Sequence, residues 1–164
     1  MFDSSVPVLT HFLKSLSAIL KKAEAHCEAK KINPDALLQA RLYPDMFPLA
    51  RQVMLAADFA KGTSARLAGA EVPSFPDVEK TFEELQARIA KTVDFITSLD
   101  KSKFAGAAGR TVNLKVAGQD MSFKGSEYLS NFALPNFYFH LTTAYDILRH
   151  NGIEIGKSDF MGRS

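Results

Sequence analysis

Hydrophobic positions recur at three- and four-residue spacing in several stretches of the chain, and this spacing predicts four long amphipathic helices. The first stretch covers residues 7–29, the second 46–67 and the third about 76–99. The fourth begins near residue 125 and ends at His150, before an Asn-Gly pair suited to a left-handed cap. We expect the second helix to be the most buried, because its apolar positions extend almost all the way around it.

Capping residues and prolines predict where these helices begin and break. Asp45 can cap the second helix, and Ser74 can cap the third, with Pro76 in its first turn. A short helical segment is expected over residues 34–42, after an Asn-Pro-Asp turn signal. Pro135 lies inside the fourth helix, where it predicts a kink or an interruption.

The period changes to two between the third and fourth helices. Val112, Leu114 and Val116 alternate with polar residues, as do Met121 and Phe123. The alternation predicts a β-hairpin with a connection over residues 117–120, and the hairpin has to pack on the helices to be stable. The tail after residue 152 is expected to lie over the surface. The fold class is therefore all-α, a four-helix bundle with a small β-hairpin before the last helix, in a single domain of residues 1–164.

Composition narrows the class of protein without naming a function. The 20 Lys and Arg residues nearly balance the 18 Asp and Glu residues and are spread along the chain, so no nucleic-acid partner is expected. No apolar run approaches the roughly 20 residues that span a bilayer, and the N-terminus lacks the pattern of a targeting segment. Cys27 is the single cysteine and is expected to be an inert buried thiol. We expect a soluble cytoplasmic protein without a membrane partner.

His140 stands out among the four histidines as the candidate for chemistry. Its neighbours on the same face of the fourth helix are Asn136, Phe137, Ala144 and Ile147, so the face is mostly apolar. A buried imidazole must be hydrogen-bonded by a neighbour or take part in chemistry. Two possibilities stay open: a core histidine held by a carbonyl or hydroxyl group, and a ligand or general base in a pocket.

Other side chains could complete a pocket between the second and fourth helices. Gln52 lies on the side of the second helix that carries Phe59, and Asn136 shares the face of His140. Tyr43 and Tyr138 could each bring a hydroxyl group to the same place. The candidate ligand-binding residues are therefore Gln52, Asn136, His140, Tyr43 and Tyr138, with His140 as the candidate catalytic residue.

The remaining histidines do not assemble a metal site with His140. His150 lies on the same helix about 80° around and about 15 Å along from His140, too far to share a metal ion. His26 is expected on the surface, beside lysines, and His11 at the edge of the apolar stripe of the first helix. No phosphate-binding loop, dinucleotide-binding or paired-cysteine motif is present.

The order of elements, with three stretches of sequence, resembles the DinB/YfiT-like superfamily of metal-dependent four-helix-bundle proteins. The stretches are Tyr43–Val53, Asn136–Gly152 and Gly156–Gly162. The resemblance covers essentially the whole chain and is closer to one bacterial branch of the superfamily, a domain of unknown function.

The resemblance implies a metal site of three histidines, one on the second helix and a His-x-x-x-His pair on the last helix. Here His140 matches the first residue of that pair, Ala144 stands in place of the second, and Gln52 matches the position on the second helix. We therefore expect a degenerate metal site with no cofactor, in which His140 is the only plausible ligand for a divalent metal.

Three functions remain open at the level of sequence. The first is a small-molecule-binding or stress-related protein with a pocket at Gln52, Asn136 and His140. The second, implied by the resemblance, is a metal-assisted thiol transferase or hydrolase that uses His140. The third is an interaction protein, since the apolar circumference of the second helix and the 13 Phe residues suggest a homodimer. The residues do not decide whether the protein is an enzyme.

Overall fold

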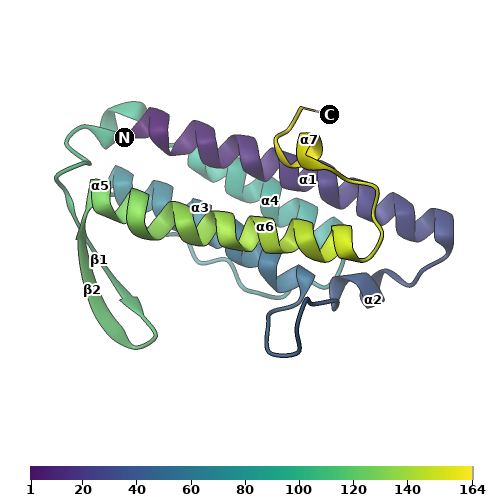
Figure 1. Cartoon of the computed structure of the whole chain (residues 1–164). Helices are drawn as coiled ribbons and strands as arrows, with labels where there is room; N and C mark the ends of the chain where they lie inside the picture. Colours follow the sequence, from purple (N-terminus) through teal and green to yellow (C-terminus); the bar gives the residue numbers. More distant parts are fainter. Residues whose placement is uncertain (164) are drawn as a thin grey trace.

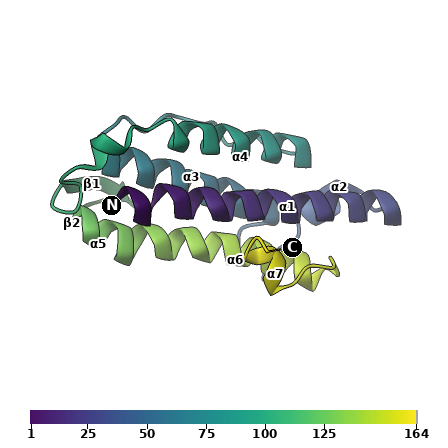
Figure 2. The ribbon, with the colours of Figure 1, turned by 90° about the horizontal axis from the view of Figure 1, so that it is seen from above.

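The computed structural model describes residues 1–163, which form long helices packed side by side and one small hairpin (Figures 1 and 2). The long helices are α1 (Val6–Lys30), α3 (Leu49–Ala68), α4 (Phe82–Thr97) and α6 (Leu134–His150). The strands β1 (Thr111–Val116) and β2 (Gln119–Lys124) precede the last long helix. The shorter helical segments are η1 (Phe2–Ser4), α2 (Pro34–Leu38), η2 (Lys101–Phe104), α5 (Gly125–Glu127), η3 (Tyr128–Ala133) and α7 (Lys157–Phe160). This confirms the predicted mostly helical fold with a hairpin before the last helix.

Helix α3 lies at the centre of the packing, in contact with α1, α4 and α6. Its buried positions surround the helix, and several are alanines, such as Ala56, Ala57 and Ala60, which let neighbouring helices approach closely. The packing of three helices around α3 explains why most of its residues are buried, as its apolar circumference predicts. Because α1, α4 and α6 already cover it, its apolar circumference does not by itself require a second copy of the chain.

The predicted start of α3 was wrong, because Asp45 lies exposed in the preceding loop and the helix begins at Leu49. The first amide of the helix is satisfied from another segment: the Leu49 N–H group donates to the Ala40 carbonyl oxygen at 2.9 Å. A side-chain cap is therefore replaced by a tertiary hydrogen bond. The preceding short helix, α2, also ends earlier than expected, at Leu38.

Helix α4 begins at Phe82, later than predicted, so the assignment of Ser74 as its cap was wrong. Thr81 Oγ1 accepts a hydrogen bond from the Glu84 N–H group, and the Glu84 carboxylate accepts one from the Thr81 N–H group, each at 3.1 Å. This reciprocal capping box satisfies two amide donors at once. The residues between Ser74 and Thr81 form an extended loop, in which Val78 is 67% exposed.

The fourth predicted helix is a run of α5, η3 and α6 in which the type of helix changes just before Pro135 (Figure 1). Segment η3 is a π-helix that ends just before Pro135, which occupies the first turn of α6. Proline has no N–H group and its ring clashes with the carbonyl group four residues earlier, so a wider turn accommodates it. Pro135 therefore does not interrupt the helical run; the change from π-helix to α-helix just before it takes the place of the predicted kink or interruption.

The hairpin has a two-residue turn, shorter than the predicted four-residue connection. Ala117 (φ 48°) and Gly118 (φ 83°) both have positive φ, as a type I′ turn requires. Val116 consequently pairs with Gln119, so Gln119 and Asp120 belong to β2. Figure 1 shows the hairpin projecting from the end of the molecule where α5 begins.

The C-terminal segment packs more firmly than its sequence indicates. Ile153 and Ile155 are buried, and Phe160 of α7 lies against the rings of Phe12 and Tyr145. The expectation of a tail lying over the surface was therefore only partly correct. None of the helices among residues 1–163 combines the length and the apolar character that a membrane crossing requires.

Candidate functional site

His140 is held in the interface between α6 and α3. Its side chain projects from α6 toward α3 and is 9% exposed. The ring of Phe59 on α3 stacks on the imidazole at a centroid distance of 5.5 Å, and the ring of Phe139 meets its edge at 5.3 Å. The imidazole is thus enclosed mainly by aromatic groups, as the apolar face in the sequence predicts.

Gln52 on α3 is the hydrogen-bonding partner of this imidazole. Its Oε1 atom lies 2.8 Å from His140 Nδ1, and the Gln52 residue is 1% exposed. The Gln52 Nε2 atom donates to the Phe47 carbonyl oxygen at 3.1 Å, which fixes the orientation of the amide. Because a carbonyl oxygen only accepts hydrogen bonds, His140 Nδ1 carries the proton and donates it to Gln52.

The opposite nitrogen of His140 therefore has a defined role. In a neutral imidazole with a protonated Nδ1, the Nε2 atom is a hydrogen-bond acceptor. Among residues 1–163, no protein group donates a hydrogen bond to His140 Nε2. Burial, followed by the positive charge of Arg51, lowers the pKa of His140 below its ordinary value. The neutral form thus prevails at neutral pH, and Nε2 is its acceptor nitrogen.

Arg51 is itself fixed by a network of charges at the side of the site. Its guanidinium group pairs with Asp77 in the loop before α4 and lies over the Phe47 ring at 5.8 Å. Asp77 also pairs with Arg88 of α4 at 2.9 Å. The loop before α4 thereby holds the positive charge that acts on His140.

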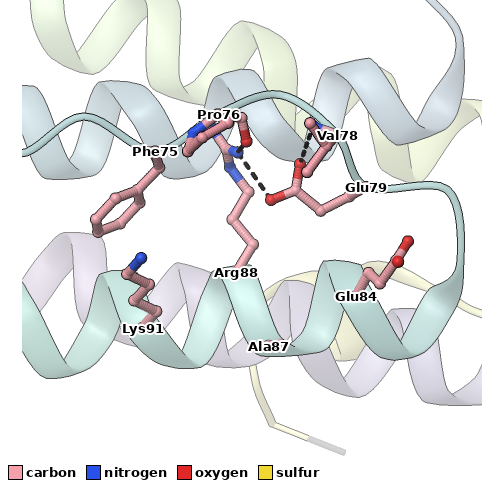
Figure 3. Close-up of a pocket in the computed structure, with 8 residues that line it drawn as sticks. All are labelled: Phe75, Pro76, Val78, Glu79, Glu84, Ala87, Arg88 and Lys91. Carbon is pink, nitrogen blue, oxygen red and sulfur yellow. Dashed lines mark hydrogen bonds and ion pairs between the residues drawn. The ribbon is translucent and has the colours of Figure 1, made fainter.

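Arg88 is the buried centre of that network and is 3% exposed. Its guanidinium group pairs with Asp58 and Glu79 at 2.9 Å each and donates to the Pro76 carbonyl oxygen at 3.0 Å. Figure 3 shows this side chain reaching from α4 to the loop, beside a cavity of about 300 Å³. Both terminal nitrogens of Arg88 are paired with these carboxylates, whereas its buried Nε atom has no hydrogen-bond partner among residues 1–163. Because the charges already neutralise one another, we do not place the site at this cavity.

A larger groove lies between the hairpin and α3, with a volume of about 590 Å³. Its apolar lining includes Phe59, the ring that stacks on His140, whereas His140 itself is not one of the lining residues. The lining residues are Arg51, Leu55, Asp58, Phe59 and Arg66 of α3, Leu114, Lys115, Val116 and Ala117 of the hairpin, and Tyr128 and Phe132 of η3.

Among residues 1–163, none of the other predicted site residues forms a hydrogen bond with His140. Asn136 donates from Nδ2 to the Phe132 carbonyl oxygen at 2.7 Å, one turn earlier in the same helical run. Tyr138 lies edge-on to Phe12 of α1 at 5.1 Å, and burial raises the pKa of its hydroxyl group. Tyr43 is 65% exposed in the loop between α2 and α3.

The donor groups present do not fit the three-histidine metal site that the resemblance implies. His140 offers one imidazole nitrogen, and Gln52 and Ala144 supply no further imidazole. Within residues 1–163, no three His, Cys, Asp or Glu side chains lie close enough together to hold a metal ion. A tightly bound divalent transition metal needs about three such ligands.

The remaining candidate groups lie elsewhere. His11 is exposed and bonds through Nε2 to the Met161 carbonyl oxygen at 3.0 Å, so it anchors the C-terminal segment. His150 is exposed at the end of α6. Cys27 is buried, and burial, followed by the charge of Glu24, raises the pKa of its thiol group. A protonated, buried thiol is unreactive, as the sequence predicts.

Sequence reasoning missed the basic side of the site. Arg51, Leu55, Phe59, Gly62 and Arg66 recur at three- and four-residue spacing and share one face of α3. That spacing could have predicted that the two arginines lie on the same face of the helix. What the sequence could not show is that the hairpin covers this face and turns it into a groove.

The sequence and the fold were both compared with those of known proteins. The chain matches a domain of unknown function, DUF1993, over residues 1–161. It is similar to the crystal structure of a DinB family member protein from Shewanella denitrificans, with 43% sequence identity and a TM-score of 0.92. The similarity covers 98% of this chain and 91% of that chain. No curated protein matches the chain. The chain therefore belongs to the DUF1993 family of DinB-like proteins, a domain of unknown function.

Proposed function

We propose that this protein binds a small molecule through the open nitrogen of His140 and that its metal site is degenerate. The observation that carries the proposal is the hydrogen-bonded series from His140 Nδ1 to Gln52 and from Gln52 to the Phe47 carbonyl oxygen. This series fixes the tautomer and leaves Nε2 as an acceptor to which no protein group among residues 1–163 donates, which supports the proposal. Gln52 thus orients the imidazole from the position where the resemblance implies a metal-binding histidine.

The surroundings of His140 indicate what kind of ligand fits. Phe59 and Phe139 flank the imidazole, and Phe139 is more than half exposed, as is Phe47 beside Gln52. A few fixed polar groups among aromatic side chains are typical of small-molecule sites. The ligand is therefore expected to have a flat apolar body and an O–H or N–H group that donates to Nε2.

Phenol is a suitable probe, with anisole as its matched control, because anisole keeps the ring but has no hydroxyl proton. Phenol is expected to shift the ¹⁵N resonance of His140 Nε2 in a saturable manner, and anisole is expected to leave it unchanged. In His140→Asn, the amide can still donate to Gln52 but nothing replaces Nε2, so phenol binding should be lost while the fold is retained. An Nε2 resonance that phenol does not move would contradict the proposal.

A hydrolase or thiol transferase that uses His140 is the second candidate, and the lowered pKa of this imidazole favours it. A neutral Nε2 can accept a proton from an attacking water or thiol, as a general base does. Metal analysis of protein purified without a histidine tag tests the metal-assisted form of this activity. A stoichiometric metal that disappears in His140→Asn would support it over the binding protein.

Hydrolysis of p-nitrophenyl acetate tests the metal-free form. A rate that rises with deprotonation of His140 and is absent in His140→Asn would support a hydrolase. An identical rate in the two proteins would exclude His140 as the base for this ester.

A further inference from the structure

The groove between the hairpin and α3 contains a positive charge, that of Arg66, which pairs with no carboxylate in the described part of the chain. Three cations line it: Arg51, Arg66 and Lys115. Arg51 pairs with Asp77, and Lys115 lies 3.9 Å from Asp120 on the exposed hairpin. Within residues 1–163, no carboxylate comes within ion-pair distance of the Arg66 guanidinium group.

The one carboxylate that lines the groove is already occupied. Asp58 pairs with Lys61 at 2.7 Å and with Arg88 at 2.9 Å. It therefore belongs to the buried network around Arg88 and does not neutralise Arg66. The groove consequently carries a net positive charge among apolar walls, which favours an anionic ligand.

Arg66 is also held in place rather than free to move into solvent. Its Nη1 atom donates to the Tyr128 hydroxyl group at 3.2 Å, and Tyr128 is almost fully buried. A Cβ atom at position 62 would overlap the same guanidinium group, so Gly62 leaves the space that Arg66 fills. A glycine inside a helix is destabilising relative to alanine, and here it makes room for this charge.

We infer that the groove binds a small carboxylate with an apolar body, and that Arg66 is the group that recognises the carboxylate. A guanidinium group offers five N–H donors in a planar fork, and only one of them is used by Tyr128 here. The single charge of Arg66 matches a monoanion. The apolar walls are Leu55, Phe59, Leu114, Val116 and Phe132.

This inference rests on the proposed function, since it describes the ligand whose donor group meets His140. Arg66 follows Phe59 by seven residues on α3, which is about 10 Å along the helix. Phe59 in turn stacks on His140. The ligand is therefore expected to be elongated, with the carboxylate at one end and the donor group at the other.

Calorimetric titration with 4-phenylbutyrate and with 4-phenyl-1-butanol tests the inference, because the two probes differ in charge and share one apolar body. The acid is expected to bind wild-type protein at least tenfold more tightly than the alcohol. Arg66→Met keeps the apolar stem and removes the charge, so it should weaken acid binding about tenfold or more and leave the alcohol unaffected. Lys30→Met removes an exposed cation at the C-terminal end of α1, so this control variant should bind both probes as wild type does.

Gly62→Ala separates a loss of binding from a loss of folding. Its methyl group displaces the Arg66 guanidinium group without removing the charge, so acid binding should fall while the melting temperature is held or rises. Equal binding of acid and alcohol, wild-type binding by Arg66→Met, or no acid binding at 10 mM would each overturn the inference. If phenol still shifts the His140 resonance in that case, the carboxylate site is wrong and the proposed function stands.

Discussion

His140 Nδ1 and Gln52 Oε1 lie 2.8 Å apart, one on α6 and the other on α3, in the interior of the helical packing. This hydrogen bond joins two segments separated by 87 intervening residues and sets the tautomer of the imidazole. It also explains why a single histidine can lie on an apolar face without a destabilising unpaired donor. The same bond leaves Nε2 as the acceptor nitrogen of the neutral ring.

Gln52→Leu is expected to lower the free energy of unfolding by about 1–3 kcal/mol, because it leaves the buried Nδ1–H group of His140 without an acceptor. Urea denaturation followed by circular dichroism measures the change. Gln39→Leu is the matched control, since Gln39 is exposed, and its effect should stay within about 0.5 kcal/mol. Equal effects of the two substitutions would show that the Gln52 hydrogen bond does not contribute to stability.

The free energy of unfolding is expected to fall as the pH is lowered through about 6.5, the pKa of an imidazole in the unfolded chain. Burial and the Arg51 charge lower the pKa of His140 in the folded protein. Between these two pKa values the unfolded chain binds more protons than the folded protein, so acid favours unfolding. The contribution of His140 stops growing below its folded pKa.

Urea denaturation between pH 5 and 8 measures this dependence. His140→Asn should decline less steeply than wild type over the range, because asparagine does not titrate. His150→Asn removes an exposed histidine and should retain the wild-type decline. If His140→Asn declines as steeply as wild type, His140 is not the group responsible.

Arg88→Met is expected to cost about 3 kcal/mol, at the lower end of the range for breaking a buried ion pair. The carboxylates left behind are partly exposed, and Asp58 and Asp77 keep Lys61 and Arg51 as partners, which limits the cost. Lys101→Met breaks an exposed pair with Asp3 and should cost less than about 1 kcal/mol. Chemical denaturation of both variants makes the comparison, and similar costs would refute the structural role of Arg88.

Thr81→Ala is expected to cost about 1 kcal/mol, because it removes the side-chain oxygen that caps α4. Ser74→Ala should be close to neutral, since Ser74 lies exposed in the loop and does not cap the helix. Thermal melts of the two variants distinguish the two possible starts of α4. A larger loss for Ser74→Ala would restore the start predicted from the sequence.

The sequence predicted the long helices well where one strong local pattern decided the outcome. The apolar stripe of α1 and the local irregularity before Pro135 are such cases. The start of α3 depends on a hydrogen bond from Leu49 to the carbonyl group of Ala40, a tertiary contact that no local pattern shows. The start of α4 was open to local reasoning, because the Thr-x-x-Glu capping box was present in the sequence, but Ser74 and Pro76 offered a competing signal.

The candidate site was likewise predictable from the sequence only in part. Helical spacing placed His140 on an apolar face, and the resemblance matched Gln52 to the corresponding position on the other helix. The groove was not predictable from spacing, because it exists only where the hairpin folds over α3. Arg66 was therefore not predicted as a site residue. Gly62, four residues before it, leaves the space that its guanidinium group fills.

A long-range ¹H–¹⁵N correlation spectrum of the imidazole groups at pH 7 tests the central claim most directly. We expect His140 to be neutral, with a protonated Nδ1 and an unprotonated Nε2, and we expect Gln52→Leu to disturb this pattern while Gln39→Leu leaves it intact. A doubly protonated His140, or a proton on Nε2 in the wild-type protein, would contradict the account.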